Sequence, residues 1–431
     1  MIKSDLQHIY YLSVLKNPPF MQAGIITIGN EILSGKTVNT NASYLASALS
    51  LLGIETQQIV AVKDLAIHIA EALRLSIENN DIVIITGGLG PTSDDITKRT
   101  LGEFFASEWI INEQVLEDVK SFFAKRNLPL TEKNRLQALV PDNAKILRNL
   151  VGTAPGLWFE VGGKIAIALP GVPFEMKHII EVEVLPRLKA IDKEFFVVHR
   201  TINTHGIGES FLSDKISHWE KNLNPSISLA YLPAVGIVKL RLTASGINKK
   251  VLEDAIEEQV SLLQEIIPEH IWGYDDETLE EICGKLLLQK KLTLCTVESC
   301  TGGAIANRII NVAGCSQYYR GSIVAYSNDV KTTLLGIPSE IINQNGAVSQ
   351  QVVELMALQG CSTMQSDFCV ATSGIAGPGG ATPEKPVGTI WIAVAHGKKV
   401  VSQKYQFGDI RQTNIARTTV AALAKLHDCL K

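Results

Sequence analysis

The sequence predicts an α/β protein in three parts: an N-terminal doubly wound, mostly parallel sheet, a small ferredoxin-like middle domain and a C-terminal three-layer α/β domain. Three observations predict this class. The chain has 431 residues, which is more than one ordinary hydrophobic core accommodates. Hydrophobic residues make up 46% and charged residues 19%, a balance typical of a globular chain. Strand-like and helix-like patterns alternate over most of its length, as in layered α/β domains.

The first domain is expected over residues 21–191. Alternating strands and helices imply a mostly parallel sheet with helices on both faces. Residues 1–20 have a short apolar stretch with no small-residue cleavage site after it, which argues against a signal peptide. Because chain ends are often poorly ordered, these residues are expected to be an extension ahead of a first strand that opens at Met21. The strands are predicted at 23–28, 58–62, 81–86 and 164–169, and the helices at 41–52, 65–77, 94–105 and 174–188.

The pattern changes in the middle of the chain. Residues 192–274 run strand, helix, strand, strand, helix, strand, which is the order of a ferredoxin-like unit. A third domain of mixed sheet direction is expected over residues 275–431. The middle elements are predicted at 195–202, 209–219, 226–231, 237–244, 249–267 and 270–274. The later helices are predicted at 278–290, 303–310, 329–335, 349–358 and from 412, and the strands at 292–297, 321–326, 368–372, 389–395 and 400–405.

Composition and charge exclude several classes of protein. The net charge is -4, so the basic excess of a non-specific nucleic-acid binder is absent, and we expect no direct nucleic-acid partner. No apolar run in the sequence reaches transmembrane length, so no membrane partner is expected. The seven cysteines form no CxxC pair and no zinc-type spacing, which favours reduced thiols and a cytoplasmic location.

A glycine-rich turn at 87–95 follows the predicted buried strand 81–86 and opens a helix. Glycines permit a tight turn with free backbone N–H groups, and a helix N-terminus favours an anion, so the turn is a candidate phosphate or nucleotide site. Adjacent carboxylates would repel such a ligand unless a divalent cation bridged them. A well-capped turn without a ligand explains the same residues. The candidate phosphate residues are Gly87, Gly88, Gly90, Thr92 and Ser93, and the candidate metal ligands are Asp94, Asp95 and Glu31.

Glu31 belongs to a second turn, at the end of the strand predicted over 23–28. Because ligands of open α/β sheets bind at the carboxyl ends of strands, Glu31 and Asn41 are candidate polar ligands there. A plain turn with Asn41 as the N-cap of the following helix is the alternative.

Ser299 lies in the segment ESCTGG at 298–303, between a predicted strand and a predicted helix. A nucleophile on such a turn is exposed, and nearby backbone amides can hold an oxyanion or a phosphate. A serine needs a base, and a lysine can serve if burial lowers its pKa. Lys331, close after the segment YSN at 326–328, is the candidate. A helix cap at Ser299 and a solvated Lys331 explain the same pattern, and Cys300 is a rival nucleophile unless it is buried and inert.

A glycine-rich loop at 372–380 links two predicted strands. It is therefore not a strand–loop–helix phosphate site, although its glycines allow a ligand to approach the backbone closely. Ser373, Lys385 and Arg411 are polar groups that could bind a phosphate or an amide there, and arginine suits bidentate phosphate contacts. A flexible loop without a ligand is the alternative.

These motifs, in this order, resemble the CinA-like protein family from Met21 to the C-terminus. The segment GGLGPTSDD at 87–95 is similar to the molybdopterin-binding domains of molybdenum-cofactor biosynthesis. The segments ESCTGG at 298–303, YSN at 326–328 with Lys331, and GIAGP at 374–378 resemble the nicotinamide-nucleotide amidase domain. The resemblance implies an amidase that requires no cofactor, and an N-terminal domain that in some relatives hydrolyses ADP-ribose with a divalent metal.

The resemblance also assigns roles to residues. Ser299 would be the acylating nucleophile, Lys331 its base, and Tyr326 a group that assists proton transfer or orientation. Ser373 stands where the family usually has threonine and keeps the hydroxyl, and Asn30 stands where relatives often carry aspartate. The residues expected to contact the substrate are Thr301, Gly302, Gly303, Ser373, Gly374, Gly377, Arg411 and Arg417, with one of the two arginines on its phosphate.

The expected reaction is conversion of nicotinamide mononucleotide to nicotinic acid mononucleotide and ammonia. In it, amides near Gly302 and Gly303 would stabilise the oxyanion. A binding or regulatory protein that holds nucleotides without turnover is the alternative. The expected partners are small nucleotides and a second copy of the chain in a homodimer.

Overall fold

The structure is a computed structural model that describes residues 21–92, 95–191 and 196–431. The extension predicted over residues 1–20 lies outside the described residues. The chain divides into two compact units. The first comprises Met1–Val198 with Ser245–Leu252, and the second comprises His199–Ala244 with Glu253–Lys431.

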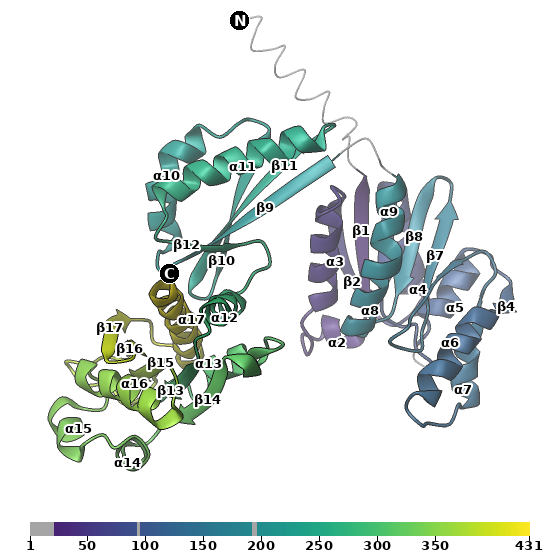
Figure 1. The fold of residues 1–431 in the computed structure, drawn as a ribbon. Helices are drawn as coiled ribbons and strands as arrows, with labels where there is room; N and C mark the ends of the chain where they lie inside the picture. Colours follow the sequence, from purple (N-terminus) through teal and green to yellow (C-terminus); the bar gives the residue numbers. More distant parts are fainter. Residues whose placement is uncertain (1–20, 93–94, 192–195) are drawn as a thin grey trace, which may run out of the picture. The chain divides into compact units, whose positions relative to one another are not determined.

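The first unit is built on a six-stranded sheet of order β2-β1-β3-β8-β7-β6 (Figure 1). The first four strands in that order are mutually parallel, β7 pairs antiparallel with β8, and β6 pairs antiparallel with β7. The β-branched run IVIIT explains why β3 lies at the centre, buried on both faces. The strands are β1 (Gln22–Ile28), β2 (Glu55–Val62), β3 (Ile82–Thr86), β6 (Lys145–Leu147), β7 (Gly156–Val161) and β8 (Lys164–Leu169).

Helices cover both faces of this sheet, as predicted for a doubly wound fold. On one face pack α3 (Thr40–Ser50), α8 (Pro173–Ile179) and α9 (Leu185–Ile191), against the odd-numbered residues of β1. On the other face pack α4 (Ala66–Asn79) and α5 (Thr97–Phe104). Consecutive strand side chains point to opposite faces, so the alternate residues Ile25 and Ile26 belong to different hydrophobic clusters.

Two local predictions in this unit are wrong. The helix predicted over 94–105 begins at Thr97, because Asp95 turns back to accept hydrogen bonds from Thr92 instead of entering the helix. The N-cap of α3 is Asn39, whose side chain accepts from the Ala42 amide, whereas Asn41 lies inside the helix and is buried. A capping side chain therefore fixes the start of α3, whereas α5 begins after Ile96 without a side-chain cap.

Residues 105–156 hold elements that the sequence pattern did not predict. Short strands of three residues carry too few positions for an alternation to be read. The elements are β4 (Trp109–Ile111), α6 (Glu113–Ala124), α7 (Glu132–Arg135), a 3-10 turn (Leu136–Ala138), β5 (Leu139–Pro141) and β6, with β4 and β5 paired. A further short helix, α2 (Asn30–Leu33), follows β1.

The second unit begins with a four-stranded sheet of order β10-β11-β9-β12. Taken along the chain, this is strand order 4-1-3-2, which is the ferredoxin-like arrangement that the sequence predicts. Two helices lie on one face of the sheet (Figure 1). The elements are β9 (Phe196–His205), α10 (Glu209–Lys221), β10 (Ile227–Ala234), β11 (Ile237–Gly246), α11 (Lys249–Ile266) and β12 (Ile271–Tyr274).

The C-terminal part is a five-stranded mixed sheet of order β14-β13-β15-β16-β17 between two helical layers. The first three strands are parallel, and the last two antiparallel. The strands are β13 (Leu294–Glu298), β14 (Tyr319–Val324), β15 (Phe368–Gly374), β16 (Thr389–His396) and β17 (Lys399–Gln406). One layer holds α12 (Leu279–Lys290), α13 (Ala304–Ile310) and α17 (Arg411–Leu430), and the other α14 (Asn328–Thr333), α15 (Ser339–Asn345) and α16 (Gln350–Met364).

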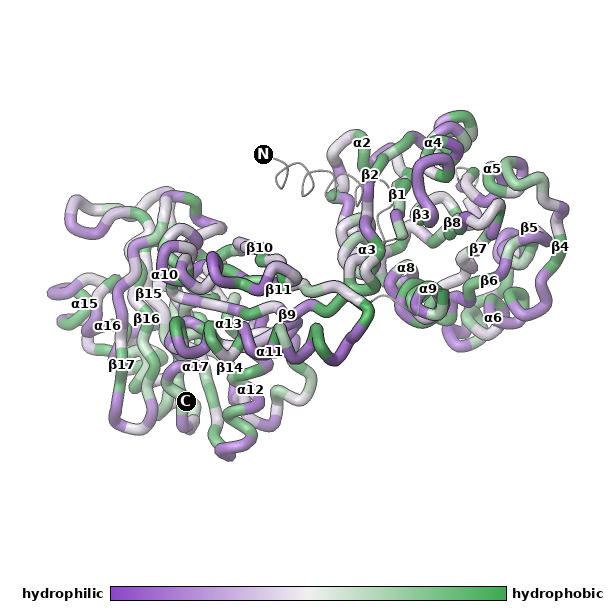
Figure 2. The backbone as a smooth tube through the Cα atoms, turned by 90° about the horizontal axis from the view of Figure 1, so that it is seen from above, coloured by the Kyte–Doolittle hydropathy of each residue, from purple (hydrophilic) through white to green (hydrophobic). Residues whose placement is uncertain are grey.

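The middle and C-terminal sheets belong to one compact unit because they share a core. Trp272 of β12 is buried in the cluster formed by α12, α13 and α17. Figure 2 shows hydrophilic and hydrophobic residues mixed along the helices. Within the described ranges, no helix has both the length and the apolarity that crossing a membrane requires.

Candidate active site

Three parallel strands of the C-terminal sheet end at one edge, and each is followed by a segment that carries polar side chains. After β13 comes the turn 299–303, after β14 the segment 325–327 and α14, and β15 ends at Gly374. Carboxyl ends of parallel strands converge, and ligands of open α/β sheets bind there. The topology therefore brings together residues that lie far apart in the sequence.

Ser299 and Lys331 meet at this edge. The Nζ atom of Lys331 lies 3.1 Å from the Oγ atom of Ser299. Both residues are buried, with Ser299 8% exposed and Lys331 1% exposed. The Lys331 amine also donates to the carbonyls of Ala325, at 2.8 Å, and Tyr326, at 3.3 Å. Lys331 is therefore held in place from three sides, and is not the solvated helix charge that was the alternative interpretation.

The surroundings of Lys331 favour a neutral amine. Burial lowers the pKa of its side chain below the usual 10.5, because the low-dielectric interior disfavours the charged form. A neutral amine has two hydrogens and one lone pair. The two backbone carbonyls can accept both hydrogens, which leaves the lone pair for the hydroxyl of Ser299. This is the arrangement that a general base requires.

Glu298 holds the turn that carries Ser299. Its carboxylate is fully buried and accepts from the amides of Gly303, at 2.9 Å, Ile305, at 3.1 Å, and Ala306, at 2.9 Å. These are first-turn N–H groups of α13, which have no partner within the helix. A negative charge at a helix N-terminus is also favoured by the helix dipole. Glu298 is the first residue of the segment ESCTGG, and the sequence alone predicted no role for it.

The oxyanion role predicted for the amides near Gly302 and Gly303 needs correction. The Gly303 N–H donates to Glu298, and the Gly302 N–H donates to the carbonyl of Ser299 at 3.2 Å. Among the described residues, the amides of Cys300 and Thr301 have no such acceptor. These two N–H groups, directly after the nucleophile in the chain, are the better candidates.

Replacing Glu298 by glutamine is expected to lower the melting temperature of the second unit. Glutamine offers one acceptor oxygen, and its NH2 group would face N–H donors, so at least one buried amide loses its partner. The expected cost is about 3 kcal/mol, in the range for buried hydrogen bonds to a charged group. Differential scanning calorimetry measures it, with Glu340→Gln on the exposed first turn of α15 as the control. Equal melting temperatures for the two variants would contradict the assigned role.

The predicted substrate residues on β15 and its loop prove to be well ordered by internal contacts. Ser373 is buried and donates to the carbonyl of Ala347 at 2.7 Å. The hydroxyls of Thr301 and Thr372 lie 2.8 Å apart, and the Ser299 amide donates to the Thr372 carbonyl at 3.0 Å. These contacts fasten the nucleophile turn to β15. The structure therefore shows Thr301 positioning the turn. The Ser373 hydroxyl is bonded to Ala347 and does not contact the turn.

Strand packing explains why residue 374 is a glycine. A Cβ atom there would lie 2.2 Å from the Ile390 side chain and 3.1 Å from the neighbouring backbone of β16. The absence of a side chain therefore lets two strands approach closely, which is independent of any ligand.

Tyr326 and Arg411 form a pair at the exposed rim. Arg411 donates to the Tyr326 hydroxyl at 3.0 Å and to the Gly377 carbonyl at 2.9 Å. Tyr326 is 60% exposed. β14 ends at Val324, so Tyr326 follows the strand predicted to contain it. Its backbone carbonyl, not its phenol, contacts Lys331. The structure thus supports a rim position for the Tyr326 phenol and not direct proton transfer.

Arg417 lies elsewhere. It lines a cavity of about 750 Å³ shared by the middle sheet and α17, beside Gly236 and Val420. The structure therefore does not bring Arg417 together with Arg411, and leaves Arg411 as the phosphate candidate near Ser299.

Cys300 is not a competing nucleophile. Its thiol is buried, and burial raises its pKa to about 12, so the reactive thiolate is disfavoured. A thiol at a helix start is predicted to have a lowered pKa, but here the loss of solvation has the larger effect. The inert thiol considered as the alternative is what the structure contains.

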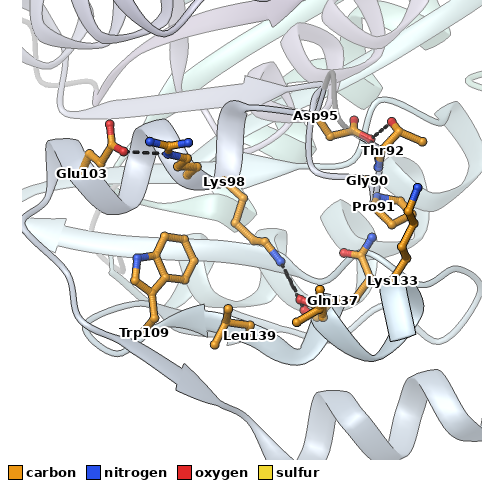
Figure 3. A pocket seen from close by; sticks show the side chains of 12 residues that line it. Gly90, Pro91, Thr92, Asp95, Lys98, Glu103, Trp109, Lys133, Gln137 and Leu139 are labelled. Atoms are coloured by element: carbon orange, nitrogen blue, oxygen red, sulfur yellow. Dashed lines mark hydrogen bonds and ion pairs between the residues drawn. The ribbon is translucent and has the colours of Figure 1, made fainter. Parts of the chain in front are cut away.

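The N-terminal glycine turn borders a cavity of about 400 Å³ (Figure 3). Gly90 and Thr92 line it, together with three cations that the sequence analysis missed, Lys98, Arg99 and Lys133. Figure 3 shows Lys98 reaching across toward the backbone at Gln137, whose carbonyl it contacts at 3.5 Å. Burial lowers the pKa of Lys98 to about 8, although Asp95 opposes the shift. Two carboxylates, Asp95 and Glu103, also line the cavity, and Glu103 pairs with Arg99. Lys98 and Lys133 are therefore the cations that favour an anionic ligand there.

The backbone conformation and close packing at residue 88 explain why it is a glycine. Its φ of +67° is left-handed, and a Cβ atom would lie 2.1 Å from the Thr97 hydroxyl. Glycine is therefore required to bring the turn against α5. Gly87 also has positive φ, beside the backbone of Ile28.

The predicted metal ligands do not converge among the described residues. Asp95 lies by the larger cavity and accepts from the Thr92 amide and hydroxyl. Glu31 lines a different cavity, of about 120 Å³, with Asn41. Ser93 and Asp94 lie outside the described residues. The donor set that the structure describes therefore does not fit a divalent ion, and no step is derived through one.

Comparison with known families matches this organisation. Residues 276–430 match the family "CinA C-terminal domain", residues 24–190 the family "Probable molybdopterin binding domain", and residues 199–273 the family "Damage-inducible protein CinA KH domain". The fold and these matches define a multidomain α/β protein with a molybdopterin-binding-type first domain.

Similarity to whole proteins extends over nearly the full length. A CinA-like protein of Flavobacterium psychrophilum is 47% identical over 411 residues, covering 94% of this chain and 98% of the relative. A CinA-like protein of Cytophaga hutchinsonii is 45% identical over 409 residues, covering 95% and 98%. The chain belongs to the CinA family. A crystal structure of CinA from Thermoplasma acidophilum, described as of unknown function, is 39% identical and covers 38% of this chain and 95% of its own, with a TM-score of 0.35.

Proposed function

We propose that the C-terminal module hydrolyses the carboxamide of nicotinamide mononucleotide, giving nicotinic acid mononucleotide and ammonia. The observation that carries the proposal is the 3.1 Å approach of the buried Lys331 amine to the Ser299 hydroxyl. A serine activated by a neutral lysine is a known solution for acyl transfer.

The proposed reaction has two stages. Ser299 passes its proton to Lys331 as its Oγ attacks the carboxamide carbon. The oxygen of the tetrahedral intermediate accepts from the amides of Cys300 and Thr301. Lys331 then returns the proton to the leaving nitrogen, the C–N bond breaks, and ammonia departs. In the second stage water, deprotonated by Lys331, attacks the acyl-serine, and Ser299 recovers its proton as the acid is released.

Arg411 is proposed to bind the phosphate of the mononucleotide. It is exposed, and its guanidinium is already oriented by the Gly377 carbonyl and the Tyr326 hydroxyl. A planar guanidinium suits bidentate contact with phosphate. Its position at the rim, with Ser299 buried, suits a substrate whose charged end stays near solvent while its neutral amide enters.

The test is to supply the purified full-length protein with nicotinamide mononucleotide and to measure ammonia and the acid product by chromatography. Equimolar ammonia and acid are expected. The alternative, a protein that binds the nucleotide without turnover, would raise the melting temperature while releasing neither product. That result would overturn the amidase proposal.

A second candidate function belongs to the N-terminal cavity. Lys98 and Lys133 around it favour binding of a phosphate-bearing ligand, and Trp109 offers an aromatic surface. The proposed function of this cavity is therefore binding of ADP-ribose.

Lys98→Met is expected to weaken binding of ADP-ribose about 10- to 100-fold, as for loss of one hydrogen bond between charged groups. Wild-type affinity is also expected to fall as the pH rises through about 8, because Lys98 is charged below its pKa and neutral above it. Isothermal titration calorimetry measures both effects, with Lys125→Met on the exposed end of α6 as the control. Unchanged affinity in Lys98→Met would exclude this cavity.

A further inference from the structure

Two histidines and an aspartate meet where the middle sheet adjoins the last helix, away from the proposed active site. His205 is the last residue of β9, and His427 and Asp428 lie near the end of α17. Both strand and helix belong to the same compact unit. None of the three residues has a role in the amidase chemistry proposed above.

The distances among the three side chains suit a shared ion. The Nε2 atom of His205 lies 3.5 Å from a carboxylate oxygen of Asp428, and the Nδ1 atom of His427 lies 3.6 Å from the same oxygen. All three potential ligand atoms lie within 4.8 Å of one another. In a tetrahedral site with bonds of about 2.0–2.1 Å, ligand atoms are about 3.3 Å apart. Small side-chain movements would therefore close the site.

Both imidazole nitrogens lack an ordinary partner. His205 is 8% exposed and His427 3% exposed, and neither the His205 Nε2 nor the His427 Nδ1 makes a hydrogen bond in the described part of the chain. Distances of 3.5 and 3.6 Å are too long for good hydrogen bonds. Buried polar atoms without partners are costly and uncommon, and they call for a ligand.

We propose that His205, His427 and Asp428 bind a divalent transition-metal ion of the Zn²⁺ class. Imidazole and carboxylate are typical ligands of such ions. Three protein ligands leave a fourth position open, and Asp428 is half exposed, so water can occupy it. His205 and Asp428 also line the cavity of about 750 Å³, which gives the ion an entry path.

The ion would join β9 to α17, and so connect the middle domain to the helix whose first residue is Arg411.

The experiment is titration of the chelator-treated full-length protein with Zn²⁺, and with Co²⁺ as a spectroscopic probe. Wild type is expected to bind one ion at this site, with visible Co²⁺ absorption typical of tetrahedral nitrogen and oxygen ligands. His205→Gln and His427→Gln are each expected to weaken binding at least about 100-fold, more than loss of an outer-shell partner. His218→Gln, on the exposed face of α10, is the matched control and should bind as wild type does.

Three results would overturn the proposal. One is the absence of stoichiometric metal binding in wild type. In that case the three side chains would form only an ion pair between the middle and C-terminal domains. Another is unchanged affinity in both histidine variants. The third is a thiolate-to-Co²⁺ charge-transfer band, which would place the ion on cysteines. The spectrum is recorded on wild type, so the test holds even if a variant fails to fold. Asp428→Asn, which keeps the side-chain shape, serves as a second variant.

Discussion

Ammonia release from nicotinamide mononucleotide is expected to fall by about 10⁴-fold or more when Ser299 is replaced by alanine. Losses of this size follow removal of a nucleophile that acts together with its base. The neighbouring thiol cannot substitute, because Cys300 is buried and its pKa is raised to about 12. Steady-state assay of kcat and KM measures the effect.

Two comparisons make the Ser299 result specific. Cys300→Ala is the control at the adjacent position, and is expected to keep most of the wild-type activity. The melting temperature of Ser299→Ala should stay close to that of wild type, because in the described part of the chain the one side-chain hydrogen bond of Ser299 is with Lys331. An active Ser299→Ala variant would remove the proposed nucleophile, whatever its stability.

Lys331→Met is expected to reduce kcat by about 10³- to 10⁴-fold, at the upper end of what a general base contributes. Methionine fills similar space but offers no lone pair to the hydroxyl. Lys331→Arg should be equally inactive, since a guanidinium remains protonated. Lys404→Met on the exposed edge of β17 is the control. Wild-type kcat in Lys331→Met would exclude the lysine as base.

The pH dependence of the wild type gives an independent measure of the same group. Lys331 acts as a base only when neutral, so log(kcat/KM) should rise with pH through the pKa of the folded protein. Because burial lowers that pKa, the rise should be centred below 10.5. The lowered pKa also means that the unfolded chain binds more protons between the two values. Stability therefore gains from this group as pH rises through that window.

Much of the fold followed from the sequence because its elements are long and regular. The apolar run of β3 and the alternation of helices and strands around it predicted a doubly wound sheet, and the structure confirms it. The strand order of the middle sheet also agrees with the predicted ferredoxin-like pattern. The strands between residues 105 and 156 were not predicted because strands such as β4 have only three residues, whereas the missed helix α6 has 12 residues and a capping Asn112, which the sequence does show.

The candidate site could be predicted only in part. The sequence pairs Ser299 with Lys331 because each follows a predicted strand, and the two side chains lie in contact in the structure. The role of Glu298 could have been predicted, because an acidic residue just ahead of a helix start often binds the free amides of the first turn. The cluster of His205, His427 and Asp428 had none, because tertiary packing joins residues more than 200 positions apart. The burial that makes Cys300 unreactive could not be predicted either, because burial depends on the folded chain.

The buried carboxylate of Glu298 would also influence release of the proposed product. Its charge occupies the positive end of α13, so an anion at this turn depends on the amides of Cys300 and Thr301. In the proposed reaction the transient oxyanion would use these two donors, whereas the acid product would bring a lasting carboxylate near Glu298. Repulsion between the two would hasten departure of the acid and weaken inhibition by it.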